Sequence, residues 1–227
     1  MIRQLLLDID DTLLDFSQAE GWALRQAFAA CGLALSDDVF AQYHQINRRQ
    51  WQRLDAGEIT RDDVLYGRFR LLFAALGWQT DPVAVETRYR GFLAQAHFPV
   101  PGALEALAAF HQTYALYIAS NGLAQTQYDR LDAAGMTPYL RGIFLSEAAG
   151  APKPEPAFFD YCFAHMPGAR REESCAGTFL VSMVSTLLLG FLIDPTGGFL
   201  PWSLALCALL LLDGLVFCRI PVFLPPL

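Results

Sequence analysis

The sequence predicts an α/β fold, a doubly wound parallel sheet that carries an inserted all-helical segment. The short apolar run Leu5–Leu7 ends abruptly in polar residues, which is typical of a buried strand that stops at a loop. Residues 103–165 alternate between helical and strand patterns, and strands separated by helices of this length pair in parallel. Residues 17–95 show helical periodicity with many charges, which indicates a separate all-helical insert.

The insert is expected to contain four or five helices. Gly32, Gly57 and the Asp81-Pro82 pair are its main breaks, because glycine ends helices and Asp-Pro begins them. The predicted helices cover residues 18–31, 37–56, 60–77 and 81–95.

The second half of the predicted sheet follows the turn Pro99–Gly102. Its expected elements are a helix at 103–111, a strand at 114–119, a helix at 123–134, a strand at 142–145 and a helix at 154–165. Each predicted strand runs into polar residues: Asp8-Ile9-Asp10, Ser120-Asn121-Gly122 and Ser146-Glu147. Open parallel sheets bind ligands at the carboxyl ends of their strands, so we expect the functional site there.

Charge is distributed unevenly along the 227 residues, whose formal net charge is −7 and mean hydropathy +0.29. Residues 1–173 carry 15 of the 16 basic and 21 of the 23 acidic residues. This acidic balance argues against nucleic acid as a partner. The N-terminal residues show no secretory signal, so we expect a cytoplasmic protein. The five cysteines are scattered and indicate neither a zinc site nor a disulfide framework.

Asp8 and Asp10 are candidates for paired acid chemistry, because they stand two residues apart where a strand enters a loop. One carboxylate can attack phosphorus while the other protonates the leaving oxygen and later activates water. A serine hydroxyl such as that of Ser120 and a lysine such as Lys153 can hold the phosphate oxygens. Such a set predicts a phosphoryl-transfer site.

These motifs resemble those of the haloacid dehalogenase-like hydrolase superfamily. The matching stretches, in chain order, are LLLDIDDT, ALYIASNG and APKPEP. The resemblance implies that Asp8 is the nucleophile and Asp10 the general acid and base. It further implies a phosphate-binding set, listed as Thr12 (which also stabilises the loop), Ser120, Asn121 and Lys153.

The resemblance also implies a domain organisation and a cofactor. Residues 1–16 and 96–173 would form the Rossmann-like core, and residues 17–95 the helical cap. Mg²⁺ would bind the Asp8 carboxylate and the backbone carbonyl of Asp10, with further ligands from a fourth motif.

The residues within and around these motifs resemble those of bacterial nucleotidases that act on pyrimidine and non-standard nucleoside monophosphates. This implies a small-molecule phosphomonoester, a nucleoside 5′-monophosphate, as substrate. Two alternatives remain: a 2-haloacid dehalogenase on the same scaffold, and an inactive truncated or membrane-anchored phosphate-binding protein. The acid at Asp10 favours phosphate chemistry, since dehalogenases of this family do not need that proton donor.

The fourth motif, Gly-Asp followed by a second acid, is expected just after residue 173 and is absent there. Residues 174–227 are instead apolar, and no acid lies between Ser174 and Ile193. Three interpretations are open: a shifted reading frame, an inner-membrane hairpin of residues 174–193 and 195–212, or a divergent soluble end. The break falls inside the catalytic domain, which favours the shifted frame. The apolar stretch 178–184 is then expected to fill the sheet position beside the first strand.

Overall fold

The computed structural model describes residues 3–168 and 174–176. The chain separates into two compact units: one comprises the residues up to Phe16 together with those from His97 onward, and the other comprises Ser17–Ala96. We call the first the core unit and the second the helical unit. The interpretations of residues 177–227 lie outside the described residues.

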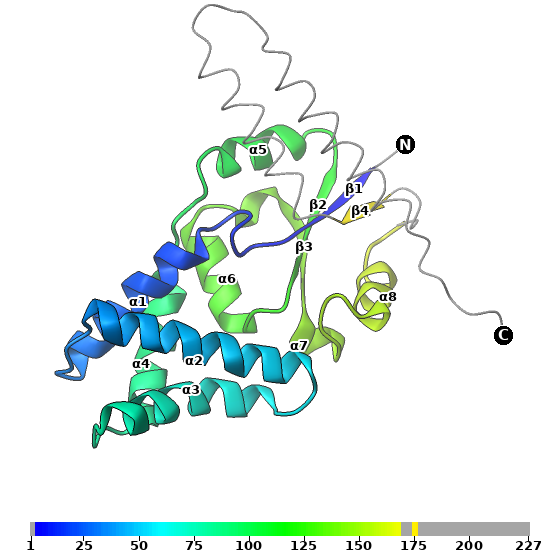
Figure 1. Ribbon diagram of the computed structural model, residues 1–227. Helices are drawn as coiled ribbons and strands as arrows, with labels where there is room; N and C mark the ends of the chain where they lie inside the picture. Colours follow the sequence, from blue (N-terminus) through cyan, green and yellow to red (C-terminus); the bar gives the residue numbers. More distant parts are fainter. Residues whose placement is uncertain (1–2, 169–173, 177–227) are drawn as a thin grey trace, which may run out of the picture. The chain divides into compact units, whose positions relative to one another are not determined.

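The core unit contains a four-stranded sheet in the order β3-β2-β1-β4 (Figure 1). Its strands are β1 (Gln4–Leu7), β2 (Ala115–Ser120), β3 (Leu140–Leu145) and β4 (Ser174–Ala176). All three neighbouring pairs are parallel, with Leu7 opposite Ile118 and Ala119 opposite Phe144. The parallel sheet predicted from the sequence is therefore confirmed.

The two faces of the sheet are both buried, because successive side chains of a strand point to opposite sides. Leu5 and Leu7 belong to a cluster with residues of α5 (Ala103–Phe110) and α6 (Ala124–Ala133). Leu6 belongs to a second cluster with residues of α8 (Pro156–Ala164). Helices thus cover both faces, as expected of a doubly wound fold.

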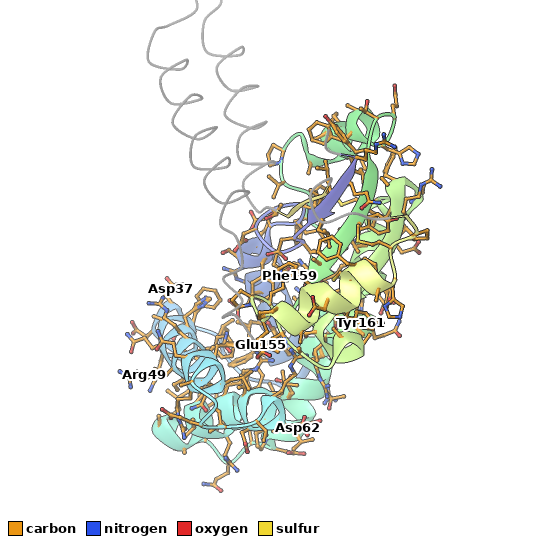
Figure 2. All side chains as sticks on the ribbon, turned by 90° about the vertical axis from the view of Figure 1, so that its right-hand side faces the viewer. Asp37, Arg49, Asp62, Glu155, Phe159 and Tyr161 are labelled. Atoms are coloured by element: carbon orange, nitrogen blue, oxygen red, sulfur yellow. The ribbon has the colours of Figure 1, made fainter. Side chains whose placement is uncertain are left out.

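Helix α8 presents four aromatic residues to the second cluster. Phe158 is fully buried, and the partly buried side chains of Phe159, Tyr161 and Phe163 pack against the cluster; Figure 2 labels Phe159 and Tyr161. Tyr117 and Phe144, on neighbouring strands, stack with their ring centroids 5.6 Å apart on the same face. This packing ties the last described helix to β2 and β3.

The sequence did not predict two short elements: a 3-10 turn, η1 (Thr137–Tyr139), and the one-turn helix α7 (Ser146–Ala149). Neither is long enough to show a hydrophobic period. Strand β3 also begins two residues earlier than expected, directly after η1.

The sheet position beside β1 is filled by β4 rather than by a later segment. Gln4 lies opposite Ser174 and Leu6 opposite Ala176. The stretch 178–184, which the sequence predicted for this position, lies outside the described residues. No helix in the described part of the chain is long and apolar enough to span a membrane. Of the expected spans at 174–193 and 195–212, only residues 174–176 are described, and they form β4.

The helical unit consists of four helices, all predicted from the sequence. They are α1 (Phe16–Ala30), whose first residue belongs to the core unit, α2 (Asp37–Asp55), α3 (Arg61–Leu76) and α4 (Pro82–Gln95). Ser36, Thr60 and Asp81 cap the last three with side-chain oxygens that accept backbone N–H groups. Charged side chains such as Asp37 and Asp62 lie exposed on this unit (Figure 2).

A buried polar network joins the four helices of this unit. Arg68 of α3 donates to both carboxylate oxygens of Glu86 on α4, at 2.9 to 3.1 Å. Asn47 of α2 accepts from Arg68 at 3.3 Å and donates to Glu20 of α1 at 3.1 Å. Burial also raises the pKa of Tyr89, which lies beside Arg68, so its phenol stays neutral. Each charge in this apolar interior therefore has a partner.

Candidate active site

The loop after β1 folds tightly around one carbonyl group. The backbone N–H groups of Thr12, Leu13 and Leu14 all donate to the carbonyl oxygen of Ile9, at 2.8 to 3.2 Å. Asp11 adopts a left-handed conformation (φ 56°) that allows this turn, and its Oδ1 accepts from the N–H of Phe16 at 3.0 Å. The buried side chain of Ile9 anchors the loop in the core, so Asp8 and Asp10 on either side of it are held at the sheet end.

Asp8 is paired with Lys153. The lysine Nζ lies 2.9 Å from Asp8 Oδ1 and donates to the carbonyl of Ala119, near the end of β2, at 2.6 Å. The N–H of Ile9 also donates to Asp8 Oδ1, at 2.8 Å. Both charged side chains are partly exposed, 27% for Asp8 and 22% for Lys153. A small ligand can therefore reach the carboxylate and the ammonium together.

Asn121 holds the loop that carries Lys153. Its Oδ1 accepts from the N–H of Lys153 at 2.7 Å, and its Nδ2 donates to the carbonyl of Lys153 at 2.9 Å. The two bonds fix the backbone at the lysine. Asn121 therefore supports Lys153, a role that the sequence did not indicate. The predicted contact between Asn121 and phosphate stays a prediction.

Ser120, the last residue of β2, lies buried at the same sheet end. Its Oγ accepts from the N–H of Gly122 and from Nε2 of Gln127, both at 3.1 Å. A hydroxyl has two acceptor sites and one proton to donate. With both acceptor sites used, the Ser120 proton is the part that can be directed at a ligand oxygen.

Asp10 lies between two side chains that the sequence analysis missed. Gln127 donates to its Oδ2 at 2.7 Å, and Arg130 donates to its Oδ1 at 2.6 Å. Both residues lie on α6, which follows the Ser120–Gly122 turn. One feature of the sequence could have pointed to these two residues. They are polar and lie three positions apart on the face of α6 that also carries the core residue Leu131.

Thr12 differs from the other predicted site residues. Its side chain is 2% exposed, and its Oγ1 makes no hydrogen bond with any described residue. The structure thus brings together Asp8, Asp10, Ser120 and Lys153, with Asn121 behind the lysine, whereas the Thr12 hydroxyl makes no hydrogen bond to this group.

The oxygen donors of the site suit a magnesium ion that keeps most of its ligands as water and phosphate. No described residue donates a hydrogen bond to Asp8 Oδ2, and the predicted second ligand is the backbone carbonyl of Asp10. Magnesium sites use one or two carboxylates together with phosphate and water. No cluster of three or more ligating side chains occurs within residues 3–168 and 174–176, so these residues supply a minimal donor set.

Comparison with known proteins identifies the family of the chain. The haloacid dehalogenase-like hydrolase profile matches residues 2–176. The HAD-hydrolase YfnB of Bacillus subtilis is 40% identical over 165 residues, which cover 73% of this chain and 70% of the relative. Pyrimidine 5′-nucleotidase PynA of Streptococcus pneumoniae is 32% identical over 171 residues, covering 75% and 72%.

Solved structures show the same fold. A magnesium-bound crystal structure of YfnB superposes with a TM-score of 0.74 at 38% identity and covers 77% of each chain. The L-2-haloacid dehalogenase Rha0230 has a TM-score of 0.62 at 18% identity, covering 77% of this chain and 72% of its own, which shows likeness of fold alone. The chain is a hydrolase that belongs to the haloacid dehalogenase-like family.

Proposed function

We propose that the chain is a Mg²⁺-dependent phosphomonoester hydrolase that forms an aspartyl-phosphate intermediate and acts on nucleoside 5′-monophosphates. The observation that carries the proposal is the Asp8–Lys153 pair at 2.9 Å, with Asp10 and Ser120 at the same sheet end. A carboxylate nucleophile beside a cation and hydroxyl donors suits attack on a phosphate dianion. The relatives named as pyrimidine 5′-nucleotidases support the choice of substrate.

In the first half of the proposed reaction, a carboxylate oxygen of Asp8 attacks phosphorus. The bond between phosphorus and the ester oxygen breaks as the Asp8–phosphorus bond forms. Asp10 gives its proton to the leaving oxygen, so the product departs as a neutral alcohol. An alkoxide would be a far poorer leaving group, which is why an acid is needed here.

In the second half, Asp10 works in reverse. It removes a proton from a water molecule, and the water oxygen forms a new bond to phosphorus. The Asp8–phosphorus bond then breaks, which releases inorganic phosphate and restores both carboxyl groups. One residue can serve as acid and then base, because the first step leaves it without its proton.

The remaining residues bind charge. Ser120 directs its proton at a phosphate oxygen, while the Lys153 ammonium balances the charge that develops on the phosphoryl group. Asn121 holds Lys153 in place through its backbone. Mg²⁺, held by the Asp8 carboxylate and the Asp10 carbonyl, would supply additional positive charge for the same oxygens.

The proposal is tested by phosphate release from the full chain. Uridine, cytidine and thymidine 5′-monophosphates and p-nitrophenyl phosphate are incubated with Mg²⁺ or with EDTA. We expect turnover with Mg²⁺ and its loss in EDTA, restored when Mg²⁺ is added back.

Two outcomes would contradict the proposal. Release of chloride from 2-chloropropionate without phosphatase activity would identify a dehalogenase. Saturable binding of nucleotide, measured by calorimetry, with no turnover under any metal condition would identify a phosphate-binding protein that lacks catalysis.

A further inference from the structure

We infer that Gln127 and Arg130 form a carboxylate clamp that positions Asp10 for proton transfer. The inference rests on the proposed function, because it assigns a role to two residues through the carboxyl group that acts as acid and base there. Neither residue needs to touch the substrate. They are positioning residues for the reaction, and both come from α6.

The clamp holds each oxygen of Asp10 with a different donor. Gln127 Nε2 lies 2.7 Å from Oδ2, and Arg130 Nη1 lies 2.6 Å from Oδ1. Arg130 Nη1 also donates to Gln127 Oε1 at 3.0 Å, which closes a ring of three side chains. A carboxyl group held at both oxygens cannot rotate without breaking one of these bonds, so its direction is fixed.

Burial makes the contact between Arg130 and Asp10 a structural requirement. The Arg130 side chain is 1% exposed, whereas that of Asp10 is 31% exposed. The Arg130 guanidinium also lies over the ring of Phe16, 5.7 Å from its centroid. A buried cation needs hydrogen-bond acceptors, because its hydration has been removed. The Asp10 carboxyl group accepts from Arg130 and keeps acceptor lone pairs with or without the proton that it transfers, and its exposed part remains accessible to a ligand.

Gln127 also connects Asp10 to Ser120. Its two N–H groups point to Asp10 Oδ2 and Ser120 Oγ, and its carbonyl faces the Arg130 guanidinium. The reversed amide would place its oxygen against a carboxylate and its NH₂ group against a cation, so the orientation follows from the chemistry of its neighbours. One side chain therefore sets the spacing between the proton-transfer group and the phosphate-binding hydroxyl.

Gly122 leaves the space that Gln127 occupies. A Cβ atom at position 122 would lie 2.7 Å from Cδ and 2.8 Å from Cγ of Gln127, closer than real Cβ atoms approach other carbons. An alanine there would force Gln127 to move while leaving every polar group of the site in the chain. Gly122→Ala is therefore a second way to open the clamp.

The clamp predicts a dependence on the leaving group. The value of kcat/KM reports the steps up to departure of the leaving oxygen, the step in which Asp10 gives its proton. A ribose hydroxyl needs that proton, whereas p-nitrophenolate leaves without it. Misdirecting Asp10 should therefore lower kcat/KM for uridine 5′-monophosphate much more than for p-nitrophenyl phosphate.

The experiment compares Q127M, R130M and G122A with the natural chain on these two substrates. We expect kcat/KM for uridine 5′-monophosphate to fall at least about tenfold more than for p-nitrophenyl phosphate, a fraction of the usual contribution of a general acid. The matched control is Q125M, which removes an exposed glutamine from the same helix and should leave both values unchanged. Circular dichroism shows whether each variant folds, and Q127M and G122A carry the test if R130M does not.

The outcomes separate the clamp from the proposed function. An equal fall for both substrates in the folded variants would show that Gln127 and Arg130 support the fold only, and would overturn the inference. If the natural chain hydrolyses neither substrate, the proposed function fails and the inference fails with it. A larger loss of kcat/KM for uridine 5′-monophosphate than for p-nitrophenyl phosphate, with both values unchanged in Q125M, would establish the clamp.

Discussion

The proposed roles of single residues depend on where each side chain is held. Asp8 lies directly after β1 and meets Lys153, which reaches it from a loop more than 140 positions later in the chain. The N–H of Ile9 contributes a second donor to the same carboxylate oxygen. One oxygen is thus used for orientation, which leaves the other for chemistry.

Replacing Asp8 by asparagine should abolish turnover, because an amide is not a nucleophile toward phosphorus. We expect kcat for nucleoside monophosphates to fall at least about 10³-fold, as found when a catalytic nucleophile is removed. Phosphate release measures the effect. D11N is the matched control: Asp11 is exposed, asparagine tolerates its left-handed conformation, and an amide oxygen can still accept from Phe16. Retained activity in D8N would refute the assignment of the nucleophile.

Cys162 should resist alkylation in the native protein. Its side chain is buried against the sheet, and desolvation raises the pKa of its thiol to about 11. The thiolate, which is the reactive form, is then a small minority species at pH 8.5. Cys31 is partly exposed, so iodoacetamide should label it at least about tenfold faster.

Peptide mapping by mass spectrometry measures both labelling rates in one sample. In concentrated urea the two cysteines should react alike, because unfolding removes the burial. Equal rates in the native protein would show that Cys162 is reached by the reagent without unfolding.

The sequence predicted the candidate site residues that end strands, but not the candidates that approach from a helix. Asp8 and Ser120 were recognisable because polar residues follow apolar runs at the carboxyl ends of parallel strands. Gln127 and Arg130 were missed because a glutamine and an arginine on a helix are usually exposed. Only the structure shows that their face of α6 is turned inward, toward Asp10.

Among the helices and strands, the long elements followed from hydrophobic period and helix breakers. All four helices of the helical unit agree with the expected ranges to within two residues, because Gly32, Gly57 and the Asp81-Pro82 pair interrupt the helical period at the boundaries. The pairing of β1 with β4 could not be predicted. The three residues of β4 are too few to show a strand pattern, and they pair with β1 at an edge of that strand that is otherwise open.

The buried Arg68–Glu86 pair should dominate the stability of the helical unit. E86L leaves the Arg68 charge buried without its carboxylate, which we expect to cost about 3–5 kcal/mol of unfolding free energy. The double variant R68M/E86L removes both charges and should recover most of this loss, since apolar residues can replace a buried ion pair. Urea unfolding followed by tryptophan fluorescence measures both. A double variant as unstable as E86L would indicate that shape, rather than charge, sets the cost.

At the scale of the whole molecule, the two units have separate cores. Ile118 is fully buried in the core unit, whereas Phe28, Tyr43 and Phe69 lie in the interior of the helical unit. Trp22, Trp51 and Trp78 all belong to the helical unit. In a W202F background, tryptophan fluorescence therefore reports the unfolding of that unit alone.

The substitution I118A should destabilise only the core unit, by about 2–5 kcal/mol. In the W202F background we expect an earlier transition in circular dichroism and an unchanged midpoint in fluorescence, because units with their own cores can unfold separately. E86L should shift the fluorescence midpoint instead. Equal shifts of both signals in I118A would show that the two units unfold as one.

The order of the chain also has a consequence for biosynthesis. β1 is made first, but its partner β2 follows about 110 residues later, with Leu7 opposite Ile118. At ordinary rates of translation this delay lasts about 5–20 s. During that interval β1 has no strand to pair with, although all four of its residues are buried in the finished sheet. The helical unit can fold during the delay, because its residues follow one another in the chain. The insert would therefore be folded on the ribosome before the sheet beside Asp8 forms.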